Sequence, residues 1–152
     1  MVGPGAARDA DAQRAEAVGS AVADAGAVLV CGGLGGVMEA ACRGARTAGG
    51  LTVGLLPGDD RAAANEWVEV AIPTGLGEGR NLLVVRAAGA VIAVGGGWGT
   101  LSEVALALRV GKPVFSLESW LPTLPGADEP GVVAAEDPAA AVRAALAAMG
   151  AG

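Results

Sequence analysis

Two glycine-rich segments of the chain could bind an anion through their backbone. They are Gly32-Gly33-Leu34-Gly35-Gly36 and Gly95-Gly96-Gly97-Trp98-Gly99-Thr100, and each lies between a short apolar run and a stretch of helical periodicity. At such a turn glycines let a ligand approach the backbone, and the first N–H groups of the helix carry about half a positive charge. Two such turns beyond the carboxyl ends of parallel strands predict a site for a phosphate-bearing ligand.

Neither segment carries a known nucleotide-binding fingerprint. The dinucleotide pattern G-x-G-x-x-G is absent from both, and neither contains the Gly-Lys-Ser/Thr of a Walker A loop. An NAD enzyme or a P-loop NTPase is therefore poorly supported. The alternative is that both segments are only tight connections between elements.

Two charged side chains could act beside these turns. Glu103 falls in the first turn of the helix after the second glycine segment, and Arg80 begins another helix in Gly79-Arg80-Asn81. Glu103 is either a carboxylate favoured by the helix dipole, worth about 0.3–1 kcal/mol, or a carboxylate beside a bound phosphate-sugar. Arg80 is either a solvated surface residue or an anion ligand, and its glycine and asparagine neighbours favour the anion ligand.

The residue types that are missing exclude several classes of chemistry. Histidine and tyrosine are absent, so histidine triads and histidine metal ligands are excluded, and catalysis would rest on carboxylates, arginine and backbone dipoles. Cys31 and Cys42 are too few for a zinc motif. We expect them to be small buried hydrophobic residues, and we expect no metal site.

Charge and hydropathy limit the partners and the compartment. The net charge is −6, and the nine arginines and one lysine are scattered, which argues against binding nucleic acid. The stretch from Ala87 to Leu101 is uncharged but contains five glycines, so it does not predict a membrane span. The start of the chain shows no signal-peptide pattern, and the expected compartment is the cytoplasm.

The elements that position these residues alternate between strand and helix. We expect strands at 27–30, 51–56, 67–72, 90–94, 113–117 and 131–134, and helices at 9–25, 37–48, 77–88, from about 101 to 110, and 137–149. This order predicts one Rossmann-like domain over residues 1–152, a doubly wound parallel sheet in three α/β/α layers.

Two further expectations follow from particular segments. Only Met1 and Val2 precede the Gly3-Pro4-Gly5 turn, so we expect a truncated first strand whose true start lies upstream. The helix around Leu82 to Val85 is apolar nearly all round, which predicts self-association as a homodimer or larger, with Trp120 contributing.

The second glycine segment resembles the signature of the LOG cytokinin-activating phosphoribohydrolases, Pro-Gly-Gly-x-Gly-Thr-x-x-Glu. Here it reads Gly95-Gly96-Gly97-Trp98-Gly99-Thr100-Leu101-Ser102-Glu103, with glycine in place of proline. The segment from Cys31 to Met38 is similar to the first glycine loop of that family. Thr74-Gly75-Leu76-Gly77-Glu78-Gly79-Arg80-Asn81 resembles the branch related to molybdenum cofactor carrier proteins.

The resemblance implies roles for individual residues. Arg80 and Glu103 correspond to the catalytic arginine and glutamate of the LOG enzymes, whereas Asn81 replaces their lysine. The ligand-binding residues it implies, together with the turns, are Gly32, Gly33, Gly35, Gly36, Met38, Asn81, Gly96, Gly97, Trp98, Gly99 and Thr100. Relatives have been labelled lysine decarboxylases. The sole lysine, Lys112, lies in a Gly-Lys-Pro connection and does not suit that chemistry.

Three functions remain open at this point. The chain binds a nucleotide or a nucleotide-derived cofactor such as molybdopterin, without requiring a cofactor of its own. Alternatively, it cleaves the N-glycosidic bond of a nucleoside 5′-monophosphate, with Glu103 facing the ribose and Arg80 holding the phosphate. The third alternative is a non-catalytic structural subunit.

Overall fold

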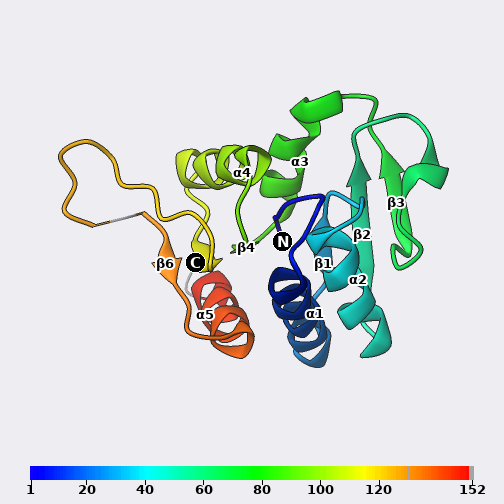
Figure 1. The fold of residues 1–152 in the computed structure, drawn as a ribbon, viewed down its shortest axis with the longest axis horizontal. Coiled ribbons are helices and arrows are strands. Elements are labelled where there is room, and N and C mark those ends of the chain that lie inside the picture. Colours follow the sequence, from blue (N-terminus) through cyan, green and yellow to red (C-terminus); the bar gives the residue numbers. More distant parts are fainter. Residues whose placement is uncertain (130, 151–152) are drawn as a thin grey trace.

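Six short parallel strands form the central layer of the structure, a computed structural model that describes residues 1–129 and 131–150 (Figure 1). The strands are β1 Leu29–Cys31, β2 Thr52–Leu56, β3 Val70–Pro73, β4 Val91–Val94, β5 Val114–Leu117 and β6 Val133–Ala134. They form two sheets, ordered β1-β2-β3 and β4-β5-β6. Val30 pairs with Val53 in the first sheet and Ile92 with Phe115 in the second. The predicted Rossmann-like α/β class is confirmed, and β3 lies at an edge.

The first two residues join the two sheets. The amino group of Met1 donates a hydrogen bond to the Val30 carbonyl oxygen at 2.6 Å. On the other side, Val2 forms a parallel bridge with Ala93 and donates its N–H to the Ile92 carbonyl oxygen at 3.0 Å. Met1 and Val2 therefore occupy the central strand position between β1 and β4, which is the place of the first strand in a doubly wound fold.

Helices cover both faces of this layer (Figure 1). They are α1 Asp9–Asp24, α2 Val37–Thr47, α3 Arg80–Ala87, α4 Trp98–Arg109 and α5 Pro138–Gly150, with short 3₁₀ turns at Arg61–Ala63 and Gly77–Gly79. α1 packs against α2 and α5 on one face, and α3 packs against α4 on the other. Two apolar clusters fill the spaces between the layers. β4 and β5 are buried along their whole length, as continuous apolar runs in parallel sheets usually are.

Two glycines let α1 and α2 approach closely. A Cβ atom at Gly19 would lie 2.0 Å from the Ala41 carbonyl oxygen, and one at Gly44 would lie 2.0 Å from the Glu16 carbonyl oxygen. Both obstacles are backbone atoms, so a side chain cannot be accommodated by a rotamer change. Glycine at these positions therefore sets the distance between the two helices.

Local sequence signals predicted the ends of several helices accurately, but they placed the start of α3 too early. Gly26, with φ of +69°, follows the end of α1 as predicted, and the Asp137 carboxylate accepts the Ala140 N–H at 2.7 Å before α5. The helix expected at 77–88 instead begins with a 3₁₀ turn and becomes α-helical at Arg80. Leu83 of α3 is 39 % exposed, so this helix is not covered on every side within the chain.

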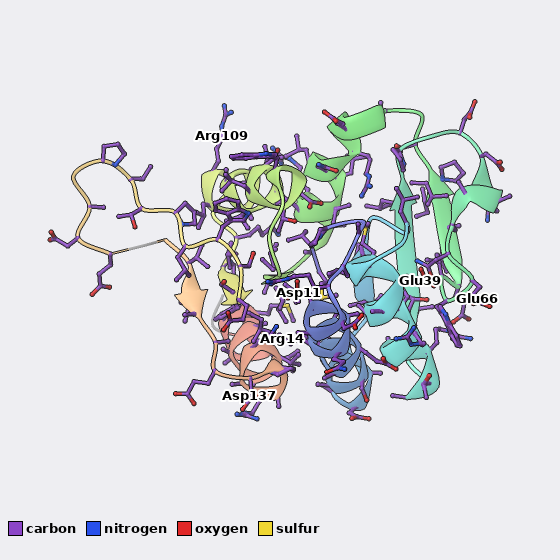
Figure 2. The ribbon with its side chains drawn as sticks, in the orientation of Figure 1. Asp11, Arg14, Glu39, Glu66, Arg109 and Asp137 are labelled. Carbon is purple, nitrogen blue, oxygen red and sulfur yellow. The ribbon has the colours of Figure 1, made fainter. Side chains whose placement is uncertain are left out.

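Charged side chains are spread over the surface. Those labelled in Figure 2 come from α1, α2, α4 and the loops; Arg109 points away from α4, whereas Asp11 of α1 is buried. Within the part of the chain that the structure describes, no helix combines the length and the apolar character needed to cross a bilayer.

Candidate functional site

A cavity of about 280 Å³ lies at the carboxyl edge of the central strands. Four segments far apart in sequence enclose it: the turn after Val2, the start of α2, the start of α3 and the start of α4. Its lining residues are Gly3, Pro4, Gly5, Met38, Arg80, Asn81, Gly97, Gly99, Thr100 and Glu103. The parallel strands bring these segments together because their carboxyl ends meet at one edge of the layer.

Arg80 is a buried cation in the wall of this cavity. Its side chain is only 7 % exposed, and its Nε has no hydrogen-bond partner among the described residues. Burial lowers the pKa of the guanidinium, while the nearby Glu103 and Cys31 oppose this. A buried guanidinium with a free donor needs an acceptor, and an anion meets that need well.

The start of α4 adds backbone donors. The first hydrogen bond of this helix runs from the Leu101 N–H to the Gly97 carbonyl oxygen at 3.0 Å. The N–H groups of Trp98, Gly99 and Thr100 precede it and have no intrahelical acceptor. Thr100 is also buried, and its Oγ1 lacks a partner in the described structure. The free N–H groups and the Thr100 hydroxyl thus offer hydrogen-bond donors at one end of the cavity. The positive end of the α4 dipole lies at the same place.

Glu103 lies one turn further along α4 and is also buried. Loss of solvent raises the pKa of Glu103 to about 7, although Arg80 and the Met1 amino group lower it in part. No ion pair links Glu103 to Arg80 in the described part of the chain, so the two charges act at longer range. A carboxyl that titrates near neutral pH can be either a proton donor or a carboxylate.

The first glycine segment connects β1 to α2, as the sequence predicted. The Gly3–Gly5 turn lies against it: a Cβ atom at Gly36 would be 2.5 Å from the Gly5 carbonyl oxygen. The Val37 N–H at the start of α2 is donated to the Pro4 carbonyl oxygen at 3.1 Å, and the Gly33 N–H to the Cys31 Sγ at 3.3 Å. These two N–H groups are therefore used within the protein. The segment lies behind the cavity wall, and Met38 of α2, two residues after it, is in the lining.

Gly32 of this segment is nevertheless close to the site. A Cβ atom there would lie 1.9 Å from Nη1 of Arg80. The missing side chain therefore makes room for the guanidinium.

Two tryptophans stand beside the second glycine segment. The rings of Trp98 and Trp120 stack with centroids 5.8 Å apart at an angle of 26°. Trp120 Nε1 donates to the Gly97 carbonyl oxygen at 3.1 Å, which holds the segment in place. Trp98 is 81 % exposed and, like Gly96, is outside the lining of the cavity.

The structure thus brings together seven of the residues expected at the site. These are Met38, Arg80, Asn81, Gly97, Gly99, Thr100 and Glu103. Gly32, Gly33, Gly35, Gly36, Gly96 and Trp98 are outside the lining. Sequence reasoning missed Gly3, Pro4 and Gly5. A signal was present, because Gly3-Pro4-Gly5 follows the apolar residues Met1 and Val2, as the other two glycine turns follow apolar strands. It received little weight because an apolar run of two residues is a weak indication of a strand.

A family model described as the SLOG cluster4 family matches residues 1–142. An uncharacterized protein of Archaeoglobus fulgidus is 43 % identical over 118 residues, which are 78 % of each chain.

Two solved structures share the fold. The first is the molybdenum cofactor binding protein of Rippkaea orientalis, with a TM-score of 0.85 and 38 % identity over 95 % of this chain and 92 % of that one. The second is the molybdenum cofactor carrier protein of Chlamydomonas reinhardtii, with a TM-score of 0.84 and 34 % identity over 98 % and 96 % of the two chains. The resemblance to carrier proteins noted in the sequence is confirmed.

Proposed function

The chain belongs to the SLOG cluster4 family, and on this basis we propose that it binds a nucleotide-like cofactor by its phosphate group. The observation that supports this most directly is the convergence of unpartnered donors in one cavity. Arg80 Nε and Thr100 Oγ1 are buried without partners among the described residues, and the free N–H groups of α4 begin beside them. A phosphate carries about 1.5 to 2 negative charges at neutral pH and three acceptor oxygens, which match this set.

The molybdenum cofactor is the ligand class that the structural neighbours suggest, since two of them are described as binding or carrying it. In this chain, Arg80, Thr100 and the start of α4 would hold the phosphate of such a pterin, and the metal would be cargo. The cavity volume of about 280 Å³ is small for a whole cofactor. The phosphate end would enter the cavity, and the ring system would remain outside it.

Calorimetric titration with AMP, and separately with molybdopterin released from a molybdoenzyme, tests this proposal. We expect Arg80→Ala to weaken binding about 10- to 100-fold, because a charge-assisted contact is lost, and Thr100→Val to weaken it less. Arg109→Ala removes an exposed arginine from the other end of α4 and should leave binding unchanged. Absence of binding to both ligands contradicts the proposal, and binding to AMP alone assigns the site to nucleotides.

A second candidate function is hydrolysis of the N-glycosidic bond of a nucleoside 5′-monophosphate. The buried Glu103, with its pKa raised to about 7, favours it. Arg80 and the α4 amides would fix the phosphate, and Glu103 would face the ribose, where positive charge develops in the transition state. Release of free adenine from AMP, lost in Glu103→Ala, supports this candidate. Thermal stabilisation by AMP without adenine release supports binding alone.

Self-association remains a prediction. Three apolar side chains are exposed in this region: Ile72 on β3, Leu76 in the following turn and Leu83 on α3. We expect self-association to be driven by the burial of these side chains. Trp120 stacks on Trp98, and its contribution to self-association also stays a prediction. Light scattering at micromolar concentration checks the prediction, and a monomer contradicts it. A chain that neither binds nor hydrolyses the ligands above would fit a structural subunit.

A further inference from the structure

One aromatic ring stands exposed beside the candidate site. Trp98 is the first residue of α4 and is 81 % exposed. Its chain neighbours Gly97 and Gly99 both line the cavity, although Trp98 itself does not. An exposed indole leaves a large apolar surface in water, so the hydrophobic effect favours a partner that covers it.

The ring lies at the end of α4 that offers the free N–H groups. Side chains in an α-helix lean toward its amino terminus, so the side chain of a first residue extends beyond the helix body. The stacking partner of Trp98 agrees with this direction, because Trp120 donates from Nε1 to the carbonyl oxygen of Gly97, just before α4. The Trp98 ring is therefore next to the amides proposed to hold a phosphate, and outside the cavity that receives it.

Trp120 supports the Trp98 ring from one side. The two ring planes are inclined by only 26°, with centroids 5.8 Å apart. Trp120 is half-buried and is fixed to the second glycine segment by its hydrogen bond, while the exposure of Trp98 leaves the rest of its ring open. A ring that is already supported loses little side-chain freedom when a ligand covers it.

The few aromatic residues of this chain are unevenly placed. The sequence has three tryptophans, one phenylalanine and no tyrosine. Phe115 is buried in β5, and Trp67 packs against the apolar core. The other two form the stacked pair at the second glycine segment. Core packing explains Phe115 and Trp67, but it does not explain an exposed ring at position 98.

The ligand proposed above has a part that fits this ring. In a nucleotide or a pterin cofactor, a planar heterocycle is joined to the phosphate through a short linker, so both groups can contact neighbouring parts of one protein surface. With the phosphate in the cavity of about 280 Å³, the heterocycle lies outside it. Aromatic side chains stack on every kind of base, because every base has a π face.

We propose that the exposed face of Trp98, supported by Trp120, is the surface on which the planar heterocycle of the ligand stacks. This inference rests on the proposed function, since it needs the phosphate held by Arg80 and the start of α4. It narrows the ligand class: phosphates that carry a planar heterocycle are bound in preference to sugar phosphates that lack one. The amide and the ring of Trp98 would thus contact different ends of one ligand.

Calorimetric titration with AMP and with ribose 5-phosphate tests the proposal, because the two ligands differ by the base. We expect the wild type to bind AMP about 10- to 100-fold more tightly. Trp98→Ala should remove most of this preference by weakening AMP binding, while ribose 5-phosphate binding stays the same. Trp98→Phe keeps an aromatic face and should retain most of the preference.

Tryptophan fluorescence gives a readout that a merely structural role of Trp98 would not change. AMP should quench the emission of the wild type through the stacked base, and ribose 5-phosphate should not. Trp98→Phe should lose this quenching although it still binds AMP. Trp67→Phe is the matched control, since it makes the same exchange at a ring that packs against the core, and it should keep the quenching.

Three results would overturn the proposal. Equal affinity of the wild type for the two ligands, or an unchanged AMP affinity in Trp98→Ala, would show that the ring does not contact the base. Equal weakening of both ligands in Trp98→Ala would show that Trp98 only supports the glycine segment. These two results leave the phosphate site in place, whereas failure of the wild type to bind either ligand would overturn the proposed function as well.

Discussion

A Cβ atom at Gly32 would lie 1.9 Å from Nη1 of Arg80, so this glycine and this arginine share one space in the wall of the candidate site. The next obstacle is the Met38 Sδ at 2.7 Å. Both atoms belong to flexible side chains, which can move when the backbone cannot. A side chain at position 32 would therefore displace the guanidinium while leaving the fold intact.

The first prediction is that Gly32→Ala weakens ligand binding nearly as much as Arg80→Ala, about 10-fold or more, with a small change in stability. Calorimetric titration with AMP and thermal unfolding measure the two effects. Gly58→Ala is the matched control, since a Cβ atom there meets nothing within 4 Å. Unchanged affinity in Gly32→Ala would contradict the role assigned to this contact.

The second prediction concerns pH and Glu103. Its folded pKa of about 7 lies above its ordinary value of 4.5. The folded chain therefore holds the proton more tightly, and this stabilisation is full below about pH 4.5 and lost as pH rises through about 7. The loss amounts to about 3 kcal/mol. Glu103→Gln should be more stable than the wild type at about pH 8 and similar to it near pH 4.5.

Urea unfolding of both proteins at the two pH values measures this difference. The comparison cancels the titrating groups that do not interact with Glu103, because both proteins carry them. A difference that does not depend on pH would mean that Glu103 titrates normally.

The third prediction concerns the two cysteines, which are buried with their sulfur atoms 3.5 Å apart. The Cys42 thiol lowers the pKa of Cys31 to about 7 by hydrogen bonding, and the Gly33 N–H and the Met1 amine contribute. Cys42→Ala should raise the pKa of Cys31, because the thiolate loses its main donor. Ultraviolet absorbance of the thiolate during a pH titration detects the shift, and an unchanged titration speaks against the hydrogen bond.

The fourth prediction concerns the contact between α1 and α2. Gly19→Ala and Gly44→Ala each place a methyl group 2.0 Å from a carbonyl oxygen of the other helix. We expect each to destabilise the protein by about 1–3 kcal/mol or more, because the helices must separate. Chemical denaturation measures this. Gly150→Ala, at an open helix end, should be neutral or slightly stabilising.

Sequence patterns predicted most of the fold because they are local. The apolar runs predicted the alternation of strands and helices. The glycines that follow helices and the Asp137 cap predicted most of the helix ends. They erred at α3, where the chain forms a 3₁₀ turn before Arg80, and they left the weak strand at Met1 without a partner. Pairing of Met1 with Val30 is a contact between segments far apart in sequence, so no local pattern reports it.

Residue types and spacing by themselves determined the α/β order and the two glycine turns, and they selected Arg80 and Glu103 as candidate site residues. Only the tertiary structure decided that the Gly3–Gly5 turn lies against the first glycine segment, where Pro4 takes the Val37 N–H. It also decided that Glu103 is buried enough to titrate near neutral pH. Both outcomes depend on how strands far apart in sequence are ordered in the sheet, and on the water that their packing removes.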